Sequence, residues 1–239
     1  MSADFDTRLE RAKLDAMKEL AYGASHEINN PLANISARAQ TLLRDEPHPE
    51  RRNALEAIRQ QAMRAHEMIA DLMLFARPPA LDPQPIDLTH WLTNVVDSVS
   101  SVAEQNNIRV TLTLPETVTP LTADEQQLTV AVTAVITNAI EAIGSDGTVE
   151  IGLRQDPVAT TIDVTDSGPG ISDAVREHLF DPFYSGREAG RGLGFGLSKC
   201  WRIVTEHGGS VAVSSEVGRG TMISLVLPAD GSKQTGADA

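Results

Sequence analysis

The chain has 239 residues, of which 41% are hydrophobic and 22% charged, so it is long enough for one large or two modest folded domains. Its formal net charge of -13 argues against nucleic acid as a partner, because nucleic-acid affinity depends on contacts from Lys and Arg to phosphate. The single cysteine, Cys200, excludes an internal disulfide and a cysteine metal cage, which favours the reducing cytoplasm.

Neither a signal peptide nor a membrane segment is expected. The first ten residues are polar and acidic. The longest apolar run, residues 128–143, is interrupted by Asn138 and Glu141 and is too short to span a bilayer. We therefore expect a cytoplasmic chain.

Two helices are predicted in the N-terminal third. Apolar residues recur every three or four positions over residues 6–46 and again over residues 50–76, and Pro47-His48-Pro49 separates the two stretches. Two helices joined by a short turn cannot bury both apolar stripes alone. The simplest solution is a homodimer in which two hairpins form a four-helix bundle. A hairpin that packs on the rest of its own chain is the alternative.

The first helix carries a histidine on the side away from its apolar stripe. At about 100° per residue, His26 lies roughly 120 to 240° around the helix from the apolar residues between positions 20 and 42. Asn30 follows one turn later on the same outer face, Glu27 is adjacent, and Pro31 is expected to bend the helix. A lone exposed histidine is usually without function, so any further role depends on the residues around it.

A proline-rich linker is predicted over residues 78–85, because its prolines cannot join a helix. It separates a helical domain, residues 1–77, from a second domain, residues 86–228. The small and polar residues 229–239 are expected to be disordered.

The second domain mixes helices and strands. Helices are expected over residues 88–105, 124–143, 173–179 and 197–207, and strands over residues 108–114, 149–153, 160–165, 210–214 and 221–227. Such a mixture, closed by a hairpin, predicts an α+β domain built as an α/β sandwich. The fold class is therefore an α-helical domain followed by an α+β domain.

Two motifs of the second domain place polar groups beside apolar elements. Asn138 lies on the apolar helix, where its amide needs a partner, either Mg²⁺ or a neighbouring strand. The run Asp166-Ser167-Gly168-Pro169-Gly170 follows a strand, so a flat base could approach its backbone while the carboxylate accepts from an amine. Taken alone, this run is also an ordinary turn.

Two further motifs follow. Phe180-Asp181-Pro182-Phe183-Tyr184-Ser185 is followed by Arg187. The run Gly190-Arg191-Gly192-Leu193-Gly194-Phe195-Gly196 then opens a helix, where free N–H groups and the positive end of the helix dipole suit phosphates. A glycine loop without a ligand has the same pattern.

Together these motifs resemble those of one protein family. His26-Glu27-Ile28-Asn29-Asn30-Pro31-Leu32 resembles the phosphoacceptor box of sensor histidine kinases. The four later motifs resemble the N, G1, F and G2 boxes of their ATP-binding domain, in the same order. That domain belongs to the Bergerat-type ATPases, which include gyrase, mismatch-repair and heat-shock chaperone proteins.

The resemblance implies an ATP-dependent protein-histidine kinase that autophosphorylates His26 and passes the phosphate to an aspartate of a separate response-regulator receiver protein. Glu27 would accept or orient a proton, and Asn30 would orient water for the reverse, phosphatase, reaction. The implied nucleotide site comprises Asn138 as Mg²⁺ ligand, Asp166, Gly168 and Gly170 at adenine, Gly192, Gly194 and Gly196 near the phosphates, Arg187 in place of the usual lysine after the F box, and Thr221 in support of the adenine site.

Two other function classes are alternatives. A gyrase-type ATP-hydrolysing clamp needs a glutamate four residues before the Mg²⁺ ligand, where this chain has Ala134. A non-catalytic scaffold that binds nucleotide as a switch would not need the intact His26, Glu27, Asn138 and Asp166.

Overall fold

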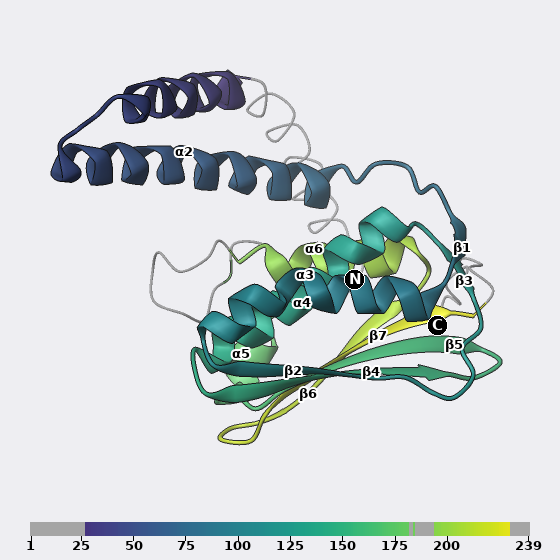
Figure 1. Ribbon diagram of the computed structural model, residues 1–239. Helices are drawn as coiled ribbons and strands as arrows, with labels where there is room; N and C mark the ends of the chain where they lie inside the picture. The colour runs from purple at the N-terminus through teal and green to yellow at the C-terminus, as the bar shows by residue number, and fades with distance from the viewer. Residues whose placement is uncertain (1–26, 182–183, 185–193, 230–239) are drawn as a thin grey trace, which may run out of the picture. The chain divides into compact units, whose positions relative to one another are not determined.

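The structure is a computed structural model that describes residues 27–181, 184 and 194–229. The chain divides after Pro79 into two compact units, the first helical and the second built of helices and strands (Figure 1). Within the described ranges, no helix is both long and apolar enough to cross a membrane.

The first unit contains an antiparallel pair of helices. The first helix is described from residue 27 to residue 44, and α2 spans Pro49–Ala76. Pro49 suits the start of α2, because the first helical residue has no intrahelical partner for an N–H group. The predicted break between the helices is confirmed, but it lies at residues 45–48 and not at 47–49, because Pro49 already belongs to α2. The bend expected at Pro31 does not interrupt the first helix, which continues through that residue.

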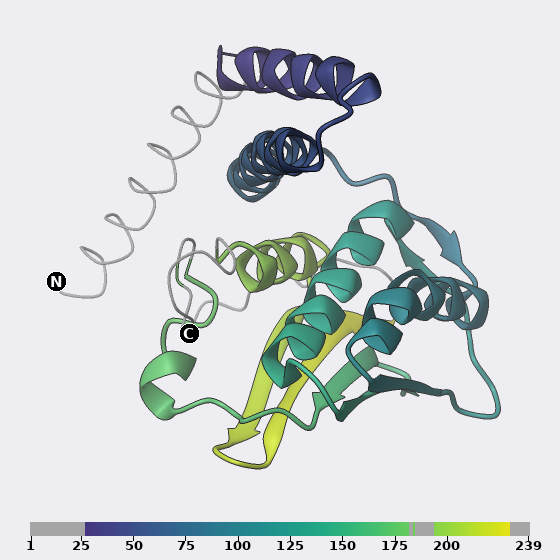
Figure 2. The same ribbon diagram turned by 60° about the vertical axis from the view of Figure 1, so that its left-hand side comes forward.

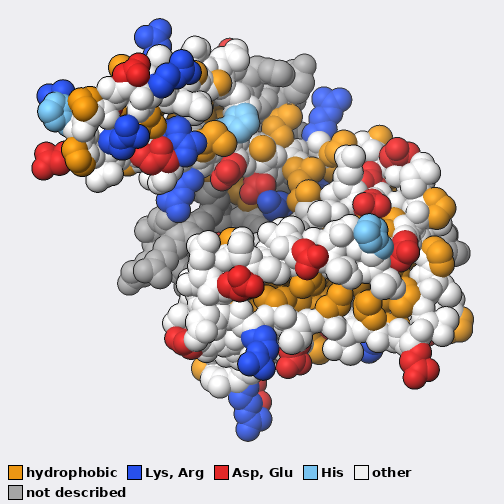
Figure 3. All heavy atoms as spheres, in the orientation of Figure 1, with side chains coloured by type: hydrophobic (Ala, Val, Ile, Leu, Met, Phe, Trp, Pro, Cys, Tyr) orange, Lys and Arg blue, Asp and Glu red, His pale blue; other side chains and the backbone are white. Residues whose placement is uncertain are grey.

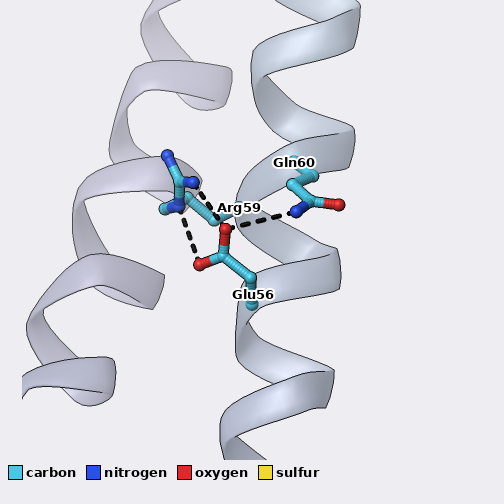
Figure 4. Close-up of polar contacts among 3 residues, drawn as sticks. All are labelled: Glu56, Arg59 and Gln60. Atoms are coloured by element: carbon cyan, nitrogen blue, oxygen red, sulfur yellow. Dashed lines mark hydrogen bonds and ion pairs between the residues drawn. The ribbon is translucent and has the colours of Figure 1, made fainter. Parts of the chain in front are cut away.

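Small side chains lie in the seam between the two helices. Ala39 on the first helix and Ala62 on α2 are both buried, which allows their backbones to approach closely. His66 of α2 adds a polar link, with its Nδ1 atom 3.0 Å from Oδ1 of Asn29. At the surface of α2, Glu56 accepts hydrogen bonds from Arg59 and Gln60 (Figure 4).

Part of the apolar surface of the first helix is not covered by α2. Ile28, Ile35 and Leu42 follow one another at seven-residue spacing and are 44%, 45% and 60% exposed. Ile58 of α2 is also exposed. Hydrophobic side chains are accordingly visible among charged ones on the surface of the hairpin (Figure 3). We call Ile28, Ile35 and Leu42 the uncovered stripe.

The second unit is a two-layer sandwich. Its five-stranded sheet has the order β2 (Ile108–Thr113), β4 (Gly147–Gln155), β5 (Ala159–Asp166), β7 (Gly220–Pro228) and β6 (Ser210–Glu216). The β2–β4 pair is parallel and the other pairs are antiparallel. One face is covered by α3 (Leu88–Gln105), α4 (Glu125–Ile143) and α6 (Gly196–Glu206), while the short α5 (Asp173–Arg176) follows β5 (Figures 1 and 2).

The alternation of each strand explains which side chains form the core. In β5, Thr160, Ile162, Val164 and Asp166 are buried, and the residues between them are partly exposed. Two of the covering helices have side-chain caps at their starts. Asp87 accepts from the backbone N–H groups of Thr89 and His90 before α3, and Asp124 accepts from that of Gln127 before α4.

A second, two-stranded sheet lies where the sequence predicted none. β1 (Gln84–Ile86) pairs antiparallel with β3 (Leu121–Ala123). Residues 84 and 85, which the sequence assigns to the linker, are therefore part of a strand. The backbone N–H of Asp82 also donates to the carboxylate of Asp124, 3.1 Å away. Other elements differ only at their ends, as α5 stops at residue 176 and β4 extends to residue 155.

Candidate functional site

Three polar side chains form a row on the helix-covered face of the sheet. Asp166 at the end of β5 is the register partner of Thr221 in β7, and Thr221 is in turn the partner of Ser215 in β6. Direct partners in antiparallel strands have their side chains on the same face. We call Asp166, Thr221 and Ser215 the polar row.

The carboxylate of Asp166 is held by backbone donors in a buried place. The residue is only 7% exposed, and the carboxylate accepts from the N–H of Gly168 at 2.8 Å and from that of Thr221. Burial raises the pKa of Asp166 above its ordinary value, and these two hydrogen bonds offset part of that rise. The carboxyl is thus a strongly oriented acceptor with little water around it.

Glycines keep the backbone close to this carboxylate. A side chain at Gly168 would lie 2.7 Å from an Asp166 oxygen and against the last turn of α4. Gly170 has a φ of +69°, and a side chain there would overlap the backbone of Glu216. The segment after Asp166 therefore fits this space only with glycine at both positions, which leaves a backbone surface that a flat ligand can approach.

The loop before α6 is described only in part. Gly194 has a φ of +68° and lies against the backbone of Tyr184. At Gly196, the first residue of α6, an added side chain would meet no atom within 4 Å, so the space beside this helix start is open. Arg187 and Gly192 lie outside the described residues.

Asn138 lies on α4, one turn before the part of the helix that contacts Gly168. It is half-buried and has a partner within the structure. Within the described ranges, no group of three or more His, Cys, Asp or Glu residues is arranged so that it could hold a metal ion. A hard cation here would combine one amide oxygen with oxygens of a ligand and water, a set that Mg²⁺ accepts.

The run of residues 26–32 that resembles a phosphoacceptor box belongs to the first unit, and we call it the acceptor segment. His26 falls just outside the described residues, and Glu27 and Asn30 are exposed on the first helix. Pro31 cannot donate to the carbonyl of Glu27, while the carbonyl of Asn30 accepts from the side chain of Asn34 at 3.0 Å. Glu27 and Asn30 are thus accessible to a second protein domain.

Two family models divide the chain between them. Residues 16–80 match the His Kinase A phospho-acceptor domain, and residues 123–231 match the histidine kinase-, DNA gyrase B- and HSP90-like ATPase domain. The chain belongs to the histidine kinases. His26 falls within the first match, and Asn138 and the polar row fall within the second.

Known kinases align with most of this chain. Sensor histidine kinase ZraS of Escherichia coli (strain K12) is 31% identical over 224 residues, which cover 93% of this chain and 48% of ZraS. The chain thus spans about half the length of the curated relatives it matches. Full-length ShkA, solved in complex with AMPPNP, has a TM-score of 0.79 and 25% identity over 89% of this chain and 46% of its own. ThkA, solved with the response regulator protein TrrA, shares the fold at TM-score 0.68 and 21% identity over 97% of this chain and 67% of its own.

The sequence analysis did not identify two polar residues that the structure links to these sites. Ser215 joins the polar row through the register of β6 and β7, and His66 contacts the acceptor segment through Asn29. The register of the last hairpin could have indicated Ser215, because a tight turn over residues 217–219 fixes which residues face each other. Nothing near His66 in the sequence distinguishes it.

Proposed function

We propose that this chain is an ATP-dependent protein-histidine kinase that phosphorylates its own His26 and passes the phosphate to an aspartate of a response-regulator receiver protein. The observation that carries this proposal is the presence, in one chain, of a phospho-acceptor match that includes His26 and an ATPase match that includes the buried Asp166. The complex of ThkA with a response regulator supports the choice of partner.

The chemistry assigned to the acceptor segment is a phosphoryl transfer. A ring nitrogen of His26 would attack the γ-phosphorus of ATP in line, forming an N–P bond while the bond to the bridging oxygen of ADP breaks. Glu27, one residue on and exposed, would orient or accept the ring proton. Asn30, exposed on the same helix, would orient water for hydrolysis of the phosphorylated receiver.

The nucleotide would bind at the polar row. Asp166 is suited to accept from the exocyclic amine of adenine, with Gly168 and Gly170 bringing the backbone to the base and Thr221 supporting it. We assign the phosphates to the segment that includes Arg187, Gly192, Gly194 and Gly196. We assign Mg²⁺ to Asn138; when bound, it would offset the negative charge of the phosphates.

We further propose that the kinase is a homodimer through its helical unit. The uncovered stripe repeats every seven residues, and exposed apolar residues at that spacing are typical of a helix seam. A second copy of the hairpin would cover the stripe and complete a four-helix bundle. Glu27 and Asn30 would remain outside it.

Incubation with γ-labelled ATP tests the proposal. The chain should acquire label that is lost in acid and retained in alkali, because phosphohistidine has that stability. His26→Gln should remove the label without changing nucleotide affinity. His48→Gln is the matched control, since His48 is exposed in the turn of the same hairpin and should keep full labelling. Acid-labile label on His26→Gln would contradict the assignment, and a wild-type chain that takes no label would contradict the kinase activity itself.

A further inference from the structure

Ser215 is the central link of a small hydrogen-bond network at the proposed adenine site. Its hydroxyl oxygen lies 2.9 Å from the backbone N–H of Ile171, 2.9 Å from the carbonyl of Gly220 and 3.0 Å from the hydroxyl of Thr221. It therefore joins the loop after Asp166 to the strand that carries Thr221. None of the roles assigned above accounts for this residue.

The chemistry of these three contacts fixes their directions. A serine hydroxyl has one proton and two acceptor positions. The N–H of Ile171 can only donate, and the carbonyl of Gly220 can only accept, so the proton of Ser215 goes to Gly220. The third contact is then a hydrogen bond only if Thr221 donates its proton to Ser215.

The consequence for Thr221 is a hydroxyl of fixed polarity. Its proton is directed toward Ser215, so its oxygen offers only lone pairs, which can accept from a donor. Asp166, its neighbour in the polar row, also presents an acceptor. A ligand group that meets both residues must therefore donate hydrogen bonds, as an exocyclic amine does and a carbonyl does not.

We propose that Ser215 is a positioning residue that sets the base specificity of the kinase, by holding Thr221 as an acceptor and so favouring an amino group, as on adenine, over a carbonyl, as at the same position of guanine. This inference rests on the proposed binding of ATP at the polar row. Ser215 itself does not touch the base. Its effect is to prevent the Thr221 hydroxyl from turning to donate to a carbonyl.

The test compares the affinities of the full chain for AMPPNP and GMPPNP with Mg²⁺, by titration calorimetry. Ser215→Ala should lower the preference for the adenine nucleotide roughly tenfold, the effect of one hydrogen bond of fixed direction. Ser215→Thr, which keeps the hydroxyl, should retain the wild-type preference for the adenine nucleotide. Ser214→Ala is the matched control, because Ser214 is exposed on the other face of the same strand.

Ser215→Cys provides a second variant if Ser215→Ala does not fold, since it keeps the volume and replaces the hydroxyl with a weak donor and acceptor. It too should lower the preference. Equal weakening of both nucleotides, or an unchanged preference in the Ala and Cys variants, would overturn the inference and leave the ATP site standing. Failure of the wild-type chain to bind AMPPNP would instead overturn the proposed function, and this inference with it.

Discussion

Replacement of Ile35 by aspartate should dissociate the proposed dimer without unfolding the hairpin. Ile35 is the middle residue of the uncovered stripe and is 45% exposed in the single chain. Complete burial of an isoleucine is worth about 1.5–3 kcal/mol, so covering this fraction contributes ~1 kcal/mol per copy and ~2 kcal/mol per dimer. That loss alone raises the dissociation constant about 30-fold.

The aspartate adds a further penalty, because a carboxylate buried in the bundle without a partner costs several kcal/mol. Sedimentation equilibrium of the full chain over a range of concentrations measures the dissociation constant, and circular dichroism reports whether the helices persist. Ile35→Asp should be monomeric at concentrations where the wild type is dimeric, with its helical signal kept.

Val217→Asp is the matched control, since Val217 is also a β-branched apolar residue on the surface, 68% exposed, in the turn between β6 and β7. It should leave the dimer unchanged. An Ile35→Asp variant that stays dimeric would refute the assignment of the uncovered stripe to the interface. A wild-type chain that is monomeric throughout would refute the dimer.

Three other outcomes are expected from the second unit. Asp166→Asn should abolish ATP binding yet raise the melting temperature of the nucleotide-free chain at neutral pH, because burial raises the pKa of this carboxyl and so penalises its charged form in the folded state. This gain in melting temperature should shrink as the pH falls through the raised pKa toward the ordinary value of 3.8, because the folded wild type then also has a neutral side chain at this position. Asn138→Ala should weaken nucleotide binding in Mg²⁺ but not in EDTA, and equal weakening in both titrations would contradict a ligand role. A fragment of residues 80–239 should melt about 3–10 °C above one of residues 86–239, which lacks the Asp82 hydrogen bond and most of β1; equal melting temperatures would show that residues 80–85 add nothing.

Long periodic segments were the part of the fold that the sequence predicted well. The repeat of apolar residues gives α2, α3 and α4 to within a residue or two, because each helix has one face that must be buried. The candidate site residues were found for another reason. Asp166 is a carboxylate at the end of a buried strand, and Gly170 lies in the glycine-containing run that follows it.

Short strands and contacts between distant segments could not be predicted in the same way. β1 and β3 have three residues each, too few to show alternation, and β1 includes a proline that ordinarily excludes a strand. The sequence therefore predicts a longer linker than the structure has. The anchoring of Asp82 by Asp124, 42 positions later, depends on tertiary structure alone.

The first helix shows what periodicity can and cannot resolve. Its apolar residues form one wide stripe in the sequence, but the structure separates a covered set, which includes Leu32 and Ala39, from the uncovered stripe. The two sets point in different directions around the helix axis. At about 100° per residue, their mean directions differ by roughly 80°, where the covered set is positions 29, 32, 36, 39 and 43 and the uncovered stripe is positions 28, 35 and 42. A helix in a four-helix bundle contacts two neighbours at about that angle. Asn30 lies on the remaining side, so one helix can pack within its own hairpin, pair with a second copy and still present its acceptor segment to a separate domain.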